Sequence, residues 1–172
     1  MPYVFVTGGA RSGKSSAAER RATAARAGVT VVATAEAGDE EMAARIDRHR
    51  AARPRSWETV EEPVALTAAL RTVAEEHFVI VDCLTLWLAN VLGSSDGDIV
   101  DQAREAIGVL VRREGDGVVV SNEVGDGIVP ADPMIRRYRD LLGQVNSLFA
   151  ASATDSYLMV AGRALALPAA PW

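Results

Sequence analysis

Short apolar runs alternate along this chain with longer segments in which apolar residues recur every three or four positions. The apolar runs occupy residues 3–7, 30–33, 78–81, 118–120 and 157–160, with a weaker strand pattern at 57–60. The segments with helical spacing occupy residues 15–26, 39–52, 64–76, 84–92, 99–113 and 134–151. Strands that alternate with helices predict an α/β fold, with a mostly parallel sheet flanked by helices on both faces.

Residues at several helix ends support these boundaries. Asp39 is a good N-cap for the second helix, and Pro54 lies just beyond its end. Pro63 is well placed to open the third helix. The polar stretch at 93–98 predicts a loop, and His77 is expected to end a helix.

The glycine-rich segment after the first strand contains the only lysine of the chain. Residues 8–15 read Gly-Gly-Ala-Arg-Ser-Gly-Lys-Ser and match the phosphate-binding pattern G-x-x-x-x-G-K-[ST]. Backbone N–H groups of such a loop surround the phosphates, while Lys14 reaches the β and γ phosphates and Ser15 offers a hydroxyl to Mg²⁺. We therefore predict a P-loop NTPase fold of the RecA-like kind that binds a nucleoside triphosphate.

Composition limits the remaining possibilities. The 172 residues suit a single nucleotide-binding catalytic domain spanning 1–172, since no linker or repeat divides them. No apolar run approaches the roughly 18 residues of a membrane span, and the first residues do not resemble a secretory signal. A net charge of −5 disfavours a nucleic-acid surface. We expect a soluble, cytoplasmic protein, in which the single Cys83 is a small buried residue.

Polar residues follow several predicted strands at the edge where ligands bind in parallel sheets. Asp82 ends a central strand in the manner of a Walker B acid, which predicts Ser15 and Asp82 as Mg²⁺ ligands. A helix-capping role for Asp82 is the alternative. Glu123 follows the fifth strand, where it could orient an acceptor hydroxyl or the metal, with a packing role for its loop as the alternative.

The second predicted helix carries an unusual face. Met42, Ile46, His49 and Arg53 share it by spacing, and Arg45 also aligns with His49. Neighbouring positive charge favours a neutral imidazole with a free lone pair, and the same arginines could neutralise a triphosphate. His49 is therefore a candidate nucleophile towards phosphorus, with a solvated surface histidine as the alternative.

These segments together resemble the bifunctional adenosylcobinamide kinase/adenosylcobinamide-phosphate guanylyltransferase family. The resemblance rests on residues 6–15, on 39–46 with His49, Arg53 and Pro54, on 82–85, and on the Ser-Asn-Glu-Val-Gly stretch in 121–130. It implies phosphorylation of the aminopropanol hydroxyl of adenosylcobinamide. It further implies transfer of GMP from GTP to that phosphate through a guanylyl-histidine, which gives adenosylcobinamide-GDP for cobalamin biosynthesis.

The resemblance also implies the site residues. His49 stands at the nucleophile's place, with Lys14 as a second catalytic residue. The implied nucleotide-binding residues are Gly8, Gly9, Ala10, Arg11, Ser12, Gly13, Lys14, Ser15, Thr34, Ala35, Glu36, Arg50, Ala51, Ala52, Arg53, Glu61 and Asp82. GTP and ATP would be substrates, Mg²⁺ the cofactor, and the assembly a homotrimer in which a neighbouring subunit helps complete each site.

Some alternatives stay open. Glu61 either contacts guanine or ribose, or is half of an acidic pair that precedes a helix. The apolar face formed by Leu84, Trp87, Leu88 and Val91 either contacts another subunit or lies in the core. For the whole protein, a small-molecule kinase without guanylyl transfer and a regulatory GTP-binding module are the competing interpretations.

Overall fold

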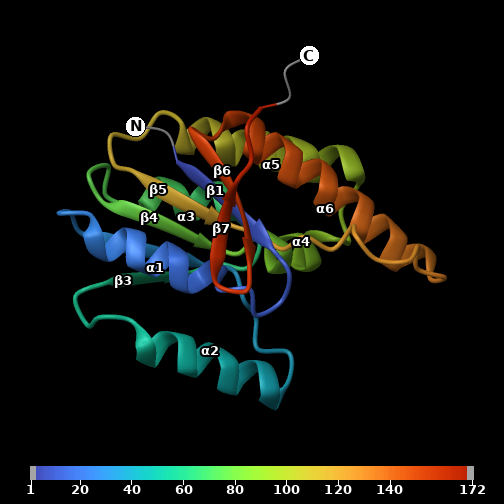
Figure 1. Ribbon diagram of the computed structural model, residues 1–172, viewed down its shortest axis with the longest axis horizontal. Helices are drawn as coiled ribbons and strands as arrows, with labels where there is room; N and C mark the ends of the chain where they lie inside the picture. The colour runs from blue at the N-terminus through green and yellow to red at the C-terminus, as the bar shows by residue number, and fades with distance from the viewer. Residues whose placement is uncertain (1–2, 170–172) are drawn as a thin grey trace.

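The computed structural model describes residues 3–169, apart from the side chain of Arg45. These residues form a seven-stranded sheet with helices on both faces (Figure 1). The elements in chain order are β1 (Val4–Gly8), α1 (Lys14–Ala24), β2 (Val29–Ala33), α2 (Glu40–Ala52), β3 (Glu58–Glu61), α3 (Leu66–Thr72), β4 (Phe78–Asp82), α4 (Leu84–Val91), α5 (Asp96–Leu110), β5 (Gly117–Val120), α6 (Pro133–Ser152), β6 (Asp155–Val160) and β7 (Arg163–Ala166).

The strands lie in the order β3-β2-β4-β5-β1-β6-β7. Neighbouring strands among the described residues are parallel except β6 and β7, which are antiparallel. The predicted parallel α/β sheet is therefore confirmed. Because Ala33 lies opposite Asp82, and Asp82 opposite Val120, the ends of β2, β4 and β5 meet at one edge of the sheet.

Alternate residues of the strands pack into two separate hydrophobic cores, one on each face of the sheet. Tyr3 and Phe5 pack with residues of α3, α4, α5 and α6 on one face, whereas Val4 and Val6 pack with Ala18 of α1 on the other. The apolar face of α4 belongs to the first core, since Leu84, Trp87, Leu88 and Val91 are at most 4% exposed. Of the two alternatives for this face, the structure shows the buried core.

Helix α2 is the least embedded helix of residues 3–169. Its described side chains include no buried residue, and in Figure 1 the helix lies below α1, away from the sheet. Asp39 caps it as predicted, because the carboxylate accepts a hydrogen bond from the Met42 N–H at 2.7 Å. The helix is thus fixed at its start and exposes most of its length beside the carboxyl edge of the sheet.

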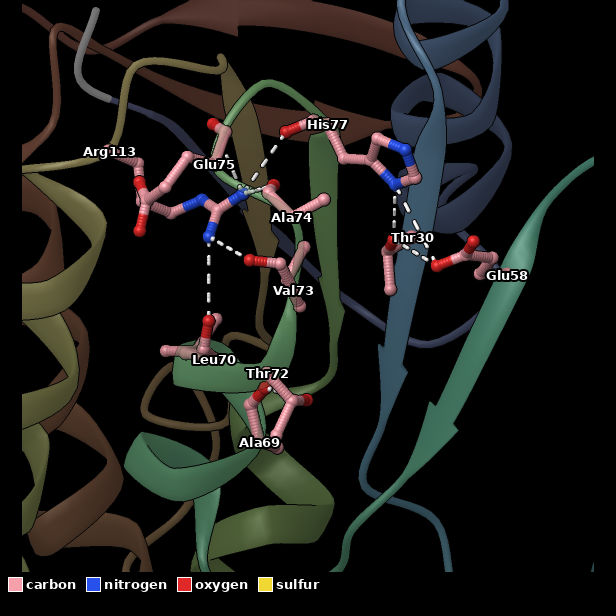
Figure 2. Close-up of polar contacts among 10 residues, drawn as sticks. All are labelled: Thr30, Glu58, Ala69, Leu70, Thr72, Val73, Ala74, Glu75, His77 and Arg113. Atoms are coloured by element: carbon pink, nitrogen blue, oxygen red, sulfur yellow. Dashed lines mark hydrogen bonds and ion pairs between the residues drawn. The ribbon is translucent and has the colours of Figure 1, made fainter.

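Helix α3 is shorter than the predicted 64–76, and a buried arginine explains its early end. Arg113, which is 4% exposed, donates hydrogen bonds to the carbonyls of Leu70, Val73 and Ala74 (Figure 2). Leu70 lies in the last turn of the helix, and Val73 and Ala74 follow it directly, so the guanidinium satisfies carbonyls at and just beyond the point where the chain turns away. The sequence predicted that His77 ends a helix, but it lies in a turn after α3. Its Nδ1 lies 2.9 Å from the Thr30 hydroxyl (Figure 2).

One further boundary is wrong and one strand was missed. Helix α5 begins inside the predicted loop, because the Ser95 hydroxyl caps it by accepting a hydrogen bond from the Asp98 N–H. Strand β7 was not predicted, since its sequence Arg-Ala-Leu-Ala lacks β-branched residues and all four side chains are exposed. A two-residue turn, Ala161 and Gly162, both at positive φ, joins it to β6.

Candidate active site

The phosphate-binding loop connects β1 to α1 as predicted. Gly8 has φ +147° and Gly13 has φ +96°, backbone conformations that L side chains rarely adopt. A Cβ atom at Gly8 would lie 2.4 Å from the Met159 carbonyl oxygen of the neighbouring β6. Glycine is needed at Gly8 for space as well as for backbone conformation.

Lys14 starts α1 and folds back across the loop. It is 7% exposed, and its ammonium donates hydrogen bonds to the Gly9 carbonyl at 2.7 Å and to the Ser12 hydroxyl at 3.5 Å. The first-turn N–H groups of α1 and the helix dipole favour an anion at this place. The loop thus joins a positive charge to a helix N-terminus, which is what a phosphate chain requires.

Ser15 and Asp82 face one another from two elements that are distant in sequence. The Ser15 hydroxyl donates a hydrogen bond to Asp82 Oδ1 at 3.4 Å. One hydroxyl and one carboxylate at the end of a phosphate-binding loop are the hard oxygen ligands that suit Mg²⁺, which completes its shell with phosphates and water. The side chains therefore fit the predicted metal.

A cleft extends from this pair to α2 and β3. Its lining comprises Ser15, Ala33, Ala35, Met42, Ile46, His49, Arg50, Arg53, Glu61, Asp82, Cys83 and Leu86. The four residues predicted to share one face of the second helix all line it, namely Met42, Ile46, His49 and Arg53. His49 thus faces the same cleft as Ser15 and Asp82. The prediction that Arg45 aligns with His49 falls on a side chain that is not among those described.

Charged groups meet along this cleft. Arg50 forms an ion pair with Glu61, and Arg53 donates to the Thr59 hydroxyl at 3.4 Å. Burial lowers the pKa of Arg53, while the carboxylates of Asp82 and Glu19 oppose this shift by favouring the charged guanidinium. An arginine remains protonated under any physiological condition, so Arg53 brings a partly desolvated positive charge to the cleft.

Cys83 lines the cleft and is partly exposed, which corrects the expectation of a buried residue. Burial of its thiol raises the pKa, and the Asp82 carboxylate raises it further. A thiol held protonated in this way is a poor nucleophile. Its place in the wall is therefore a matter of packing.

Several predicted nucleotide-binding residues do not line this cleft. Thr34 is fully buried, and Glu36 and Ala51 are exposed outside the cleft lining. Ala52 lines a separate groove against α1, together with Pro54 and Trp57. Gly9, Ala10 and Arg11 are exposed at the outer part of the phosphate-binding loop.

Sequence reasoning missed two features of the site. Ala33 and Leu86 form apolar cleft walls, and no polar signal marks such residues. The β6–β7 turn supports the phosphate-binding loop, since the Gly162 N–H donates to the Ser12 carbonyl at 2.9 Å. A glycine two residues after the end of the strand was the available signal for this turn.

Residues 4–167 of the chain match the family described as cobinamide kinase / cobinamide phosphate guanyltransferase. The chain belongs to this family. The bifunctional adenosylcobalamin biosynthesis protein CobP of Pseudomonas aeruginosa is 45% identical over 169 residues, which cover 97% of this chain and 98% of that protein. The bifunctional adenosylcobalamin biosynthesis protein CobU of Escherichia coli is 37% identical over 174 residues, covering 92% and 96%.

Solved structures are similar in fold. The flagellar accessory protein FlaH from Methanocaldococcus jannaschii gives a TM-score of 0.55 at 16% identity, covering 96% of this chain and 77% of that one. The RadB recombinase gives 0.54 at 14% identity, covering 91% and 73%. These likenesses confirm the predicted P-loop NTPase fold.

Membership of the cobinamide kinase / cobinamide phosphate guanyltransferase family confirms that the chain is an enzyme of both classes, a kinase and a guanylyltransferase. The regulatory GTP-binding module is thereby set aside. Among the helices of residues 3–169, none combines the length and apolar character needed to cross a membrane.

Proposed function

We propose that this enzyme phosphorylates the aminopropanol hydroxyl of adenosylcobinamide and then guanylylates the product through His49. The observation that carries the proposal is the shared cleft, in which His49 of α2 faces the Ser15 and Asp82 pair at the phosphate-binding loop. A kinase alone needs the loop and the acid but no histidine across the cleft. A guanylyltransferase needs a nucleophile within reach of the same nucleotide.

In the kinase step the acceptor hydroxyl attacks the γ-phosphorus and the nucleoside diphosphate leaves. Lys14 and the N-terminus of α1 stabilise the charge on the transferred and leaving oxygens. Glu123 is a candidate for orienting the hydroxyl, because its N–H donates to the Gly8 carbonyl at 3.1 Å and so fixes its backbone beside the loop. A Glu123→Gln enzyme with unchanged kinase and transferase rates would exclude this role.

In the transferase step a ring nitrogen of His49 attacks the α-phosphorus of GTP. A nitrogen–phosphorus bond forms, the bond to the β-phosphate oxygen breaks, and pyrophosphate leaves. An oxygen of adenosylcobinamide phosphate then attacks the same phosphorus, which releases the imidazole and gives adenosylcobinamide-GDP. Arg50 and Arg53 supply positive charge beside this centre, and Mg²⁺ held by Ser15 and Asp82 would neutralise phosphate charge.

The remaining parts of the proposal concern assembly and location. We propose the homotrimer that the family resemblance implies. Apolar side chains exposed on the segment before α6 and its first turn, where Ile128 is 97% and Met134 62% exposed, would suit a subunit contact. We also propose a cytoplasmic location, where nucleoside triphosphates are available, and no nucleic-acid partner because the net charge is −5.

The decisive experiment uses Mg²⁺ and GTP labelled at the α-phosphate, followed by denaturation and measurement of retained label. His49→Ala removes the proposed nucleophile. His77→Asn is the matched control, since His77 is the only other histidine of the chain and precedes β4 at the opposite edge of the sheet. We expect acid-labile, base-stable label on the wild type and the control alone. Label on His49→Ala, or none on a wild type that binds GTP, would exclude His49 as nucleophile.

A further inference from the structure

Thr34 lies at the place where the β2–β4 ladder ends, beside the proposed metal-binding acid. The preceding residue, Ala33, is the register partner of Asp82, and the Thr34 N–H donates to the Asp82 carbonyl at 3.1 Å. The Thr34 residue is 0% exposed. It is thus adjacent to the active-site cleft without forming part of its surface.

The Thr34 hydroxyl is bonded on both sides to one residue of the neighbouring strand end. It donates to the Cys83 carbonyl at 2.7 Å and accepts from the Cys83 N–H at 2.9 Å. Two backbone groups that have left the ladder are therefore satisfied by a single side chain. This arrangement fixes the backbone immediately after Asp82.

The Thr34 carbonyl is also bonded, to a side chain of α4. Asn90 Nδ2 donates to this carbonyl at 2.8 Å and to the Pro63 carbonyl at 3.1 Å. Pro63 follows Glu61 by two residues, so the same amide joins the ends of β2 and β3. The N–H, hydroxyl and carbonyl of Thr34 all bond within the protein.

We propose that Thr34 is a positioning residue for Asp82, rather than a residue that touches the nucleotide. By holding the backbone of Asp82 and Cys83, its hydroxyl keeps the Asp82 carboxylate directed at Ser15, 3.4 Å away. Asn90 holds Thr34 itself in place. The inference rests on the proposed role of Asp82 as a metal-holding acid. In this interpretation Thr34 acts on the metal through Asp82 and does not contact the nucleotide.

The test uses Thr34→Val, which keeps the shape of the side chain and removes the hydroxyl, with Thr34→Ser as the conservative variant that keeps it. Two quantities are measured by calorimetry, the affinity for GTP in EDTA and the affinity for Mg²⁺ in the presence of a non-hydrolysable GTP analogue. Loss of a group that orients a metal ligand weakens metal affinity by about 10- to 100-fold. We expect a loss in this range for Thr34→Val, a GTP affinity in EDTA within about twofold of wild type, and recovery in Thr34→Ser.

Other results would overturn the proposal. A weakened GTP affinity in EDTA with unchanged Mg²⁺ affinity would mean a direct nucleotide contact. A lower melting temperature with both affinities unchanged would mean a structural role only. If wild type shows no Mg²⁺ binding that depends on Asp82, tested with Asp82→Asn, the proposed function itself fails at this site. Should Thr34→Val not fold, Thr34→Cys retains a weak donor and is expected to show an intermediate Mg²⁺ affinity.

Discussion

Replacing Gly13 by alanine tests whether the phosphate-binding loop depends on one left-handed residue. Gly13 is the N-cap of α1, with φ 96° and ψ 12°. An alanine forced into a sparsely populated backbone region costs about 1–3 kcal/mol. The new Cβ would also lie 3.2 Å from the Gly162 Cα in the β6–β7 turn, so loop and turn must separate slightly.

The expected loss of stability is therefore about 2 kcal/mol or more, because strain and crowding act in the same direction. For a chain of this size, about 2 kcal/mol corresponds to a fall in melting temperature of roughly 4–8 °C. Nucleotide binding should weaken as well, since the loop that surrounds the phosphates is displaced. Thermal unfolding and calorimetric titration with GTP measure the two effects.

Gly9→Ala is the matched control in the same loop. A Cβ at Gly9 would meet nothing within 4 Å, and Gly9 is not among the residues at positive φ. Alanine at such a position leaves stability unchanged or raises it by about 0.4–1 kcal/mol. If Gly13→Ala were as stable as Gly9→Ala, the argument from backbone conformation and contact with the β6–β7 turn would be refuted.

Three further predictions concern other parts of the molecule. Glu61→Gln should change stability by less than about 1 kcal/mol, because its ion pair is exposed. If Glu61 contacts guanine, the same variant should lower the preference for GTP over ATP by about tenfold, measured by competition binding. Arg113→Met should cost about 3 kcal/mol or more in urea unfolding, since several buried carbonyls lose their donor, whereas the exposed neighbour in Arg112→Met should cost about 0.5 kcal/mol or less. Burial raises the pKa of Tyr138 to about 12, so the unfolded chain ionises first as the pH rises. Stability contributed by this phenol is complete below about pH 10 and is lost between about pH 10 and 12, and the melting temperature of Tyr138→Phe should fall less over that interval.

Each of these predictions has a contrary result. Unchanged nucleotide preference in Glu61→Gln would leave Glu61 as a structural partner of Arg50. Equal stabilities of the Arg113 and Arg112 variants would mean that the carbonyls find other donors. Parallel melting curves for wild type and Tyr138→Phe above pH 10 would mean that the phenol is solvated.

The phosphate-binding loop and the acid that faces it were predictable, because both depend on short sequence patterns. A phosphate-binding loop needs glycines, a lysine and a hydroxyl at fixed spacing, and a buried strand followed by an acid marks the opposite side. The helical spacing of Met42, Ile46, His49 and Arg53 likewise placed these four on one face, and all four line the cleft. Periodicity therefore identified both the sheet and the face of α2 that lines the cleft.

Element ends were less predictable, because distant residues determine them. Arg113, more than thirty residues later in the chain, donates to the carbonyls of Leu70 in the last turn of α3 and of Val73 directly after it, where the helix ends at Thr72. Strand β7 has exposed side chains with no strand pattern, and its place is fixed by antiparallel pairing with β6, which itself pairs with β1. Neither residue propensities nor hydrophobic periodicity indicate these hydrogen bonds or this strand pairing.

By itself, the sequence determined the α/β class, the phosphate-binding loop, the acid opposite it and the family to which the chain belongs. Only the tertiary structure decided that Thr34 is bonded on all sides inside the protein, although the family resemblance implied a nucleotide contact for it. The same was true of the apolar face of α4, which the structure buries in the core. The physical reason is shared, since spacing specifies which residues lie on one face or at one edge, whereas burial and hydrogen-bond partners depend on what packs against them.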